Sequence, residues 1–180
     1  MSCRKLASIG SLLVLCMALT TLGQGTGTIR YEVWEGIGGT AVTDLTGNAN
    51  FPENPDWDDE LALFESPTDR ADNFGGRLYG WLHPTESAAY TFRLAADDGA
   101  EVWGGYRDWF GRGQKSDPVA LVGGEKYYVE ALYKEGGGGD NIAVAWQINA
   151  DPDPNAPIDP NDIGVIDRAY LSPAPRQPSL

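Results

Sequence analysis

The sequence predicts an all-β domain, built as an antiparallel β-sandwich or β-barrel, and two observations carry this prediction. Four segments alternate apolar and polar residues with a period of two, and turn residues separate them. No run of twelve residues shows the apolar stripe of an amphipathic helix. The chain of 180 residues is long enough for one domain with its own core.

The clearest strand patterns lie in residues 28–35, 90–96, 126–134 and 142–148. In the last of these, Ile142, Val144, Trp146 and Ile148 would share one face of the strand. Shorter strands are expected at residues 61–64, 77–82, 100–103, 119–122 and 165–171. We interpret residues 48–60, which are acidic and contain two prolines, as a long solvated loop.

The first 25 residues read as a signal peptide, because the basic pair Arg4 and Lys5 precedes the apolar stretch 11–19. This stretch is too short to span a bilayer, and no later segment approaches that length. We therefore expect a secreted, extracellular protein (or one of the periplasm or cell envelope), without membrane insertion. The predicted domain covers residues 27–173, and residues 174–180 form a Pro-rich tail.

Cysteine content and charge exclude several classes of function. Both cysteines, Cys3 and Cys16, lie in the signal peptide, so the mature domain would have no disulfide, thiol nucleophile or zinc-thiolate site. Cys16 could be lipidated, but Leu15 stands before it where a lipobox needs a small residue. The formal net charge of −13 disfavours binding to nucleic acid or anionic membranes. We expect a monomer.

Residues 133–146 (YKEGGGGDNIAVAW) place four consecutive glycines and an Asp-Asn pair between two strand-like runs. A hairpin needs only two turn residues. The extra residues are either slack, or they shape a loop whose bare backbone approaches a ligand or a metal ion.

The segment Asp97-Asp98-Gly99 also has two interpretations. Asp-Gly is a favoured hairpin turn, and strand patterns lie on both sides of it. Adjacent side chains on a regular strand point to opposite faces, so two neighbouring aspartates can hold one ion only if the backbone between them is kinked or cis. Calcium, which takes six to eight oxygen ligands, could stabilise such a backbone.

The order of several motifs resembles that of the protective-antigen-fourteen domain, a lectin-like β-barrel module of toxins, yeast flocculins and bacterial surface proteins. The similar motifs are Asn73-Phe74-Gly75, Arg77, Gly80-Trp81-Leu82-His83-Pro84, Tyr90-Thr91-Phe92, Asp97-Asp98-Gly99, Gly124, residues 127–135 and Ala143-Val144-Ala145-Trp146. Residues 27–39 and 165–173 resemble the ends of a bacterial, secreted subgroup, so the resemblance covers residues 27–173.

The resemblance implies a calcium site that binds a glycan. In carbohydrate-binding members, a cis peptide joins the two aspartates, the aspartates hold calcium, and the ion binds vicinal sugar hydroxyls. On this chain the aspartates are Asp97 and Asp98. The second loop of the site is the glycine stretch, where Glu135, Asp140 and Asn141 are the candidate ligands.

A candidate stacking surface for the sugar lies in residues 103–113 (WGGYRDWFGRG). Tyr106, Arg107, Trp109 and Phe110 combine aromatic rings with a polar partner, as sugar rings require, since they offer C–H groups to stack and hydroxyls to bond. Trp103 ends a predicted strand, and we expect it in the core.

The sequence therefore predicts a secreted, non-catalytic carbohydrate-binding module that recognises a glycan or cell-surface polysaccharide with the help of Ca²⁺. The alternative is a structural or adhesive module with no ligand at the loop site, which the short segment between Gly105 and Leu121 favours. We do not expect an enzyme. His83, the only histidine, is interpreted as a turn residue, and no GxSxG motif accompanies it.

Overall fold

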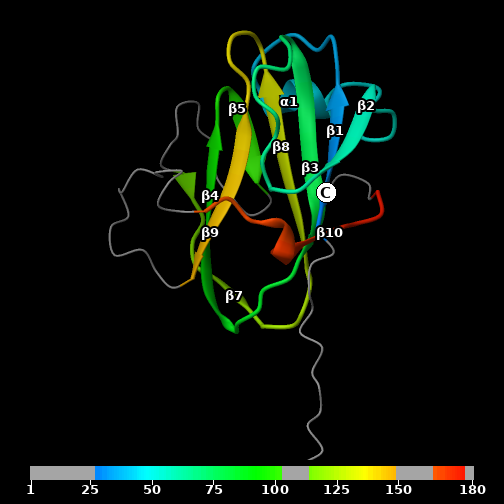
Figure 1. Cartoon of the computed structure of the whole chain (residues 1–180). Helices are drawn as coiled ribbons and strands as arrows, with labels where there is room; N and C mark the ends of the chain where they lie inside the picture. Colours follow the sequence, from blue (N-terminus) through cyan, green and yellow to red (C-terminus); the bar gives the residue numbers. More distant parts are fainter. Residues whose placement is uncertain (1–26, 103–113, 149–163, 177–180) are drawn as a thin grey trace, which may run out of the picture.

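The computed structural model describes residues 27–102, 114–148 and 164–176, and the described strands form two antiparallel β-sheets (Figure 1). The larger sheet has the order β2-β1-β3-β8-β5, with β10 also paired to β3, and the smaller sheet has the order β6-β4-β7, with β9 also paired to β4. Because the strands divide between two sheets, the predicted all-β fold is confirmed as a sandwich, and the barrel alternative is not.

The strands of the larger sheet are β1 (Ile29–Trp34), β2 (Trp57–Leu61), β3 (Phe74–Leu82), β5 (Gly99–Val102), β8 (Tyr127–Glu135) and β10 (Leu171–Pro173). Those of the smaller sheet are β4 (Ala88–Ala96), β6 (Gln114–Lys115), β7 (Val119–Leu121) and β9 (Ile142–Ile148). A short helix α1 (Val42–Thr46) and a 3-10 turn η1 (Arg168–Tyr170) complete the described elements. The four clearest predicted strands appear as β1, β4, β8 and β9, with ends within two residues of the expected ones.

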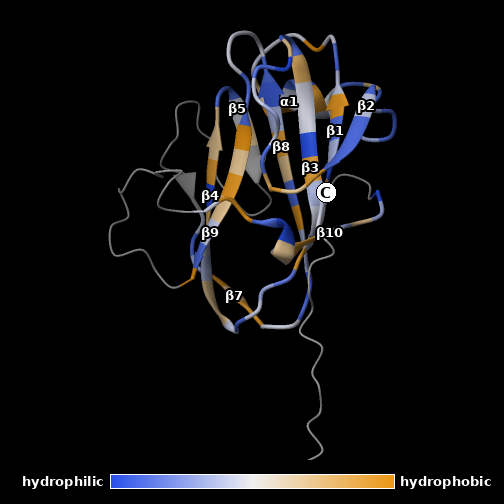
Figure 2. Ribbon diagram, viewed as in Figure 1, coloured by the Kyte–Doolittle hydropathy of each residue, from blue (hydrophilic) through white to orange (hydrophobic). Residues whose placement is uncertain are grey.

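The core lies between the two sheets and consists of the residues that alternate along each strand. Tyr31, Leu78, Tyr133 and Val144, for example, are buried there, and apolar segments line the facing strands in Figure 2. Period-two alternation in the sequence therefore identified the inward faces correctly. Within the described ranges no helix has the length and apolar character needed to cross a bilayer.

A second, smaller apolar cluster covers the outer face of the larger sheet near one end. Leu45 of α1 packs there with Trp34 of β1 and Leu132 of β8. A Cβ atom added to Gly75 would lie only 2.6 Å from Leu45 Cδ1, so the glycine lets the helix approach the sheet closely.

Strand β2 corrects the prediction that residues 48–60 form a loop throughout. Trp57–Leu61 is an edge strand that pairs with β1 from Ile29↔Leu61 to Val33↔Trp57. Its side chains are exposed or half-buried on both faces, and Figure 2 shows it as a mostly hydrophilic ribbon. An edge strand that faces water on both sides needs no alternation, and its charges discourage pairing with other molecules.

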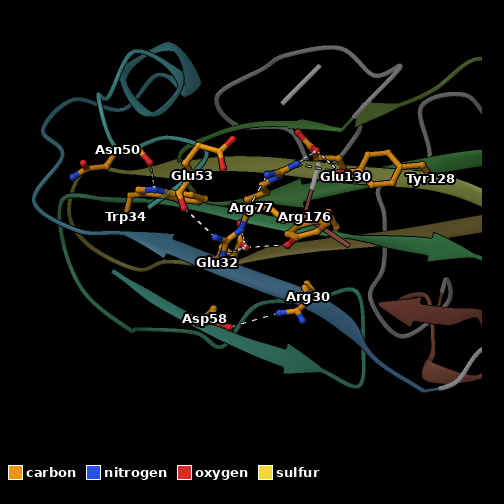
Figure 3. Close-up of polar contacts among 11 residues, drawn as sticks. Arg30, Glu32, Trp34, Asn50, Glu53, Asp58, Arg77, Tyr128, Glu130 and Arg176 are labelled. Atoms are coloured by element: carbon orange, nitrogen blue, oxygen red, sulfur yellow. Dashed lines mark hydrogen bonds and ion pairs between the residues drawn. The ribbon is translucent and has the colours of Figure 1, made fainter. Parts of the chain in front are cut away.

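A buried ionic cluster occupies the centre of the outer face (Figure 3). Arg77 of β3 donates to Glu130 Oε2 at 2.8 Å and lies 3.9 Å from Glu32 Oε2. Tyr128 donates to Glu130, and Tyr79 donates to Glu32 at 2.9 Å. Each carboxylate therefore has both a cationic and a hydroxyl partner, as a buried charge requires.

The segment after β10 crosses this cluster. Ala174 is buried, and Arg176 Nε donates to Glu32 Oε1 at 2.7 Å while its Nη1 donates to the carbonyl of Glu53 at 3.0 Å. Residues 174–176, which the sequence assigns to the tail, thus pack against the outer face.

Replacing Arg77 tests how much the fold depends on the buried cluster. We expect Arg77→Met to lower the free energy of unfolding by about 3–5 kcal/mol, because two buried carboxylates would lose their shared cation. The matched Arg30→Met variant, which removes only exposed ion pairs with Asp58 and Glu60, should cost less than about 1 kcal/mol. Urea unfolding at pH 7 measures both values, and equal losses would contradict a stabilising role of the buried cluster.

Candidate functional site

Four loops meet at the end of the sandwich where β1, β4 and β8 finish, and we call this the loop end (Figure 1). They are residues 35–41 before α1, residues 65–73 before β3, Asp97–Asp98 between β4 and β5, and the glycine loop, residues 136–141. The strand register aligns them, since Trp34 is opposite Gly75, Phe74 is opposite Glu135, and Ala96 is opposite Ile142.

Asp97 and Asp98 connect the two sheets, because β4 belongs to the smaller sheet and β5 to the larger one. The hairpin interpretation of Asp97-Asp98-Gly99 is therefore wrong, since β4 pairs with β9 and β5 pairs with β8. The Asp97 N–H donates to the Asn141 carbonyl at 3.2 Å, and Asp98 Oδ2 accepts from the Gly136 N–H at 2.8 Å. The structure thus brings the aspartate pair and the glycine loop together.

The peptide bond between Asp97 and Asp98 is trans, which differs from what the family resemblance implies. In the ranges that the structure describes, Phe51–Pro52 is the one cis peptide bond.

Two glycines of the glycine loop lie in close contact with the neighbouring loops, and a third has a backbone conformation that favours glycine. A Cβ atom at Gly136 would lie 2.7 Å from Thr40 Cγ2, and one at Gly139 would lie 2.7 Å from Asp97 Oδ2. Gly138 has a φ of +120°, a backbone conformation that favours glycine. The loop is therefore fitted against its neighbours and is not slack.

Asp140 links the glycine loop to the 65–73 loop. Its Oδ2 accepts from the backbone N–H groups of Arg70 at 2.5 Å and Ala71 at 2.9 Å, and its carbonyl accepts from the Asp69 N–H. The residue is 3% exposed, and its Oδ1 is buried without a hydrogen-bond partner. Asn141, the other predicted ligand of this loop, is half-buried beside Asp97.

Glu135, the last residue of β8, is 1% exposed, and its Oε1 is also buried without a hydrogen-bond partner. Burial raises the pKa of its carboxyl from 4.5 to about 7, and the charges of Asp98, Asp97 and Asp140 contribute to the increase. The three aspartates therefore face this carboxyl closely enough to repel its charge.

Lys134 supplies a buried positive charge beside these carboxylates. Its Nζ donates to the carbonyl oxygens of Gly39 at 2.8 Å and of Glu135. Burial lowers the pKa of the ammonium group, and the charges of Asp44, Glu135 and Asp98 oppose that decrease. The lysine ties the 35–41 loop to the end of β8.

Two further acidic residues of the loop end were not identified from the sequence. Asp72 Oδ1 accepts from the Gly138 N–H at 3.2 Å, and Asp69 Oδ1 lies 3.8 Å from the position of a Cβ atom on Gly139. Asp69 has a positive φ of 53°, which is uncommon for a residue other than glycine. The only signal in the sequence is their place just before Asn73-Phe74-Gly75.

The ligand atoms available at the loop end are carboxylate and carbonyl oxygens, which are the ligands that a hard cation such as calcium prefers. Glu135 Oε1 and Asp140 Oδ1 are buried oxygens that lack a partner, and such atoms carry a free-energy cost that a cation would relieve. Among the residues that the structure describes, however, no three His, Cys, Asp or Glu side chains are already grouped to hold a metal ion. Binding would therefore require these side chains to move toward one another.

Several predicted residues lie outside the described part of the chain, namely Trp103, Tyr106, Arg107, Trp109 and Phe110. His83, by contrast, is described, and it does more than form a turn. Its Nε2 makes a hydrogen bond with Ser172 Oγ at 2.7 Å, which holds β10 to the end of β3.

A family model described as the PA14 domain matches residues 39–159. A mouse N-acetyl-beta-glucosaminyl-glycoprotein 4-beta-N-acetylgalactosaminyltransferase 1 is 28% identical in an alignment covering 67% of this chain and 14% of that protein. The chain therefore spans about a seventh of the length of this relative.

Solved structures share the fold at low sequence identity. A PA14 sugar-binding domain from an RTX adhesin has a TM-score of 0.58 and 15% identity, with 82% of this chain and 99% of that chain covered. The Epithelial Adhesin 9 A domain from Candida glabrata, in complex with Galb1-4GlcNAc, has a TM-score of 0.51 and 10% identity, with 70% and 84% covered. An anti-sigma factor domain-containing protein from Clostridium clariflavum also matches, with a TM-score of 0.58 and 16% identity over 86% of this chain and 48% of that chain.

A substitution at Gly99 tests the close packing of the loop end. A Cβ atom there would lie 2.3 Å from the Thr40 carbonyl oxygen, so we expect Gly99→Ala to reduce stability by about 1–3 kcal/mol. Gly38→Ala is the matched control, because a Cβ atom at Gly38 meets nothing within 4 Å, and it should change stability by less than about 1 kcal/mol. Chemical denaturation compares the two variants, and an unaffected Gly99→Ala protein would show that the loops are not in contact.

The raised pKa of Glu135 predicts a pH dependence of stability. The folded state holds the proton more tightly than the unfolded state, so this stabilising contribution is complete below pH 4.5 and is lost as the pH rises through about 7. In EDTA, Glu135→Gln should therefore be more stable than the wild type at pH 8 and should lose less stability between pH 5 and pH 8.

Urea midpoints measured across this pH range check the sign. The exposed Glu125, in the turn before β8, provides the control, and Glu125→Gln should retain the wild-type profile. A Glu135→Gln profile parallel to the wild type would refute the assignment.

Proposed function

Because this chain belongs to the PA14 domain family, we propose that it is a non-catalytic carbohydrate-binding module in which calcium at the loop end helps to hold a glycan. The proposed ligand is a glycan or a cell-surface polysaccharide, and the proposed location is outside the cell, as the signal-like residues 1–25 indicate. Two structural neighbours are sugar-binding by their own descriptions, which supports the carbohydrate part of the proposal.

The observation that carries the calcium part is the pair of buried, unpartnered oxygens, Glu135 Oε1 and Asp140 Oδ1, beside Asp97 and Asp98. Four carboxylates lie in one small region, and the pKa of Glu135 is raised first by burial and then by repulsion from Asp98, Asp97 and Asp140. A divalent cation would relieve it and would satisfy both oxygens. Asp97, Asp98, Glu135, Asp140 and Asn141 would hold the ion, and the ion would supply a charged centre for sugar hydroxyls.

A structural or adhesive module without a ligand is the second candidate, and one observation favours it. Carboxylates of Asp72, Asp98 and Asp140 each accept a hydrogen bond from the backbone of a neighbouring loop. The loops can therefore hold one another without an ion, so the two candidates differ in their dependence on calcium.

We propose no catalytic role. The mouse relative is named as a glycosyltransferase, but the match includes 14% of its length. His83, the only histidine of this chain, forms a hydrogen bond with Ser172 of β10, near the end of the sandwich opposite the loop end.

Thermal unfolding in excess calcium and in EDTA tests the proposed metal site. Calcium at one hundred times its dissociation constant should stabilise the folded protein by about 2.7 kcal/mol, which raises Tm by roughly 5–10 °C for a domain of this size. Asp98→Asn should abolish the shift, whereas Asp58→Asn, on the exposed strand β2, should retain it.

A glycan array probed in calcium and in EDTA then separates the candidates. Calcium-dependent binding that Asp98→Asn abolishes supports the carbohydrate-binding module. If calcium causes no Tm shift and no glycan on the array is bound, the domain would be assigned the structural role.

A further inference from the structure

Trp57 is the one aromatic residue among the large apolar side chains that are exposed within the described ranges. It is 37% exposed and begins the edge strand β2, where it lies opposite Val33. Val33 is one residue from the end of β1, so Trp57 lies at the same end of the sandwich as the four loops. The exposed part of this indole ring is a candidate surface for a ligand at the loop end.

The indole ring is held in a fixed orientation by its neighbours. The ring makes an edge-to-face contact with the ring of Tyr31, with 5.5 Å between the two ring centroids and an interplanar angle of 78°. Arg70 Cζ lies 4.8 Å from the centroid of the Trp57 ring, and Arg70 Nη2 donates to Glu35 Oε1 at 2.8 Å. These contacts position the ring in advance of any ligand, which reduces the entropy cost of binding.

Polar groups beside the ring remain available to a ligand. The Glu35 side chain is 56% exposed, so its carboxylate can accept further hydrogen bonds from solvent or a ligand. The Arg70 side chain is 20% exposed, so part of it is within reach of a ligand. The guanidinium lies over one face of the indole ring and holds the Glu35 carboxylate nearby, so the exposed part of the ring has hydrogen-bonding groups beside it, as a sugar requires.

Arg70 also connects this surface to the loop end. The backbone N–H of Arg70 donates to Asp140 Oδ2 at 2.5 Å, while its side chain lies against Trp57. Residues 67–69 and 71–73, on either side of Arg70 in the chain, are exposed. One residue therefore spans the distance between the carboxylates of the loop end and the indole ring.

We propose that Trp57, Arg70 and Glu35 form a second saccharide subsite, which receives another pyranose ring of a glycan whose first ring is held at the loop end. The inference rests on the proposed function of the loop end. The C–H face of the added ring would stack on the indole, and its hydroxyls would bond to Glu35 and Arg70. The subsite favours neutral oligosaccharides of two or more rings over monosaccharides.

A printed array of mono-, di- and oligosaccharides, probed in calcium with wild type, Trp57→Ala and Trp57→Phe, tests the subsite. Trp57→Ala should weaken binding to glycans of two or more rings roughly fivefold to tenfold and leave monosaccharide binding unchanged. Trp57→Phe should lose less, because it keeps an aromatic face. The matched control is Trp81→Ala, which removes a half-buried tryptophan near the opposite end of β3 and should bind like the wild type.

The outcomes separate the subsite from the function on which it rests. If wild type binds glycans in a calcium-dependent manner and Trp57→Ala binds every one of them equally well, the subsite is refuted and the proposed function stands. Equal losses for monosaccharides and longer glycans also refute it. If wild type binds nothing on the array, both fail. An unchanged calcium-induced Tm shift in Trp57→Ala verifies that the loop end remains folded.

Discussion

The arrangement of the loop end depends on one constraint, which is that backbone N–H groups beyond the ends of the strands must still find acceptors. Aspartate side chains provide them. Asp98 accepts from Gly136, Asp140 accepts from Arg70 and Ala71, and Asp72 accepts from Gly138. Each of these bonds joins two different loops, so the carboxylates determine how the loops pack. The same requirement concentrates negative charge in one region.

That concentration of charge links the stability of the loops to their proposed role. The buried ammonium group of Lys134 offsets part of this charge, because it interacts with Asp44, Glu135 and Asp98. It also donates to carbonyl oxygens of two segments. Glu135 adds to the negative charge when it ionises, and burial and three neighbouring aspartates therefore raise the pKa of its carboxyl. The cation that we propose for this site would reduce the repulsion that Lys134 does not offset.

The sequence predicted the strands of the core, because a strand with one buried face must alternate. It did not predict β2, since an exposed edge strand has no such requirement. The Asp97–Asp98 pair and the glycine loop were associated correctly through the family resemblance, whereas local turn preferences pointed to a hairpin that does not exist. Trp57 and Arg70 could not be paired from the sequence, because their contact depends on the β1–β2 register and on the hydrogen bonds of Asp140.

The hydrogen bond between Gly27 and the last strand has a consequence for how neighbouring segments are placed around the domain. The Gly27 N–H donates to the Leu171 carbonyl at 3.0 Å, so the chain enters the sandwich beside β10, on the half of β3 that ends at Leu82. After β10 the chain crosses the outer face of the larger sheet to Arg176, which contacts Glu32 and Glu53. A segment attached through residue 27 would therefore lie at the end of the sandwich opposite the loops, whereas a segment attached through residue 176 would start on the outer face of the larger sheet.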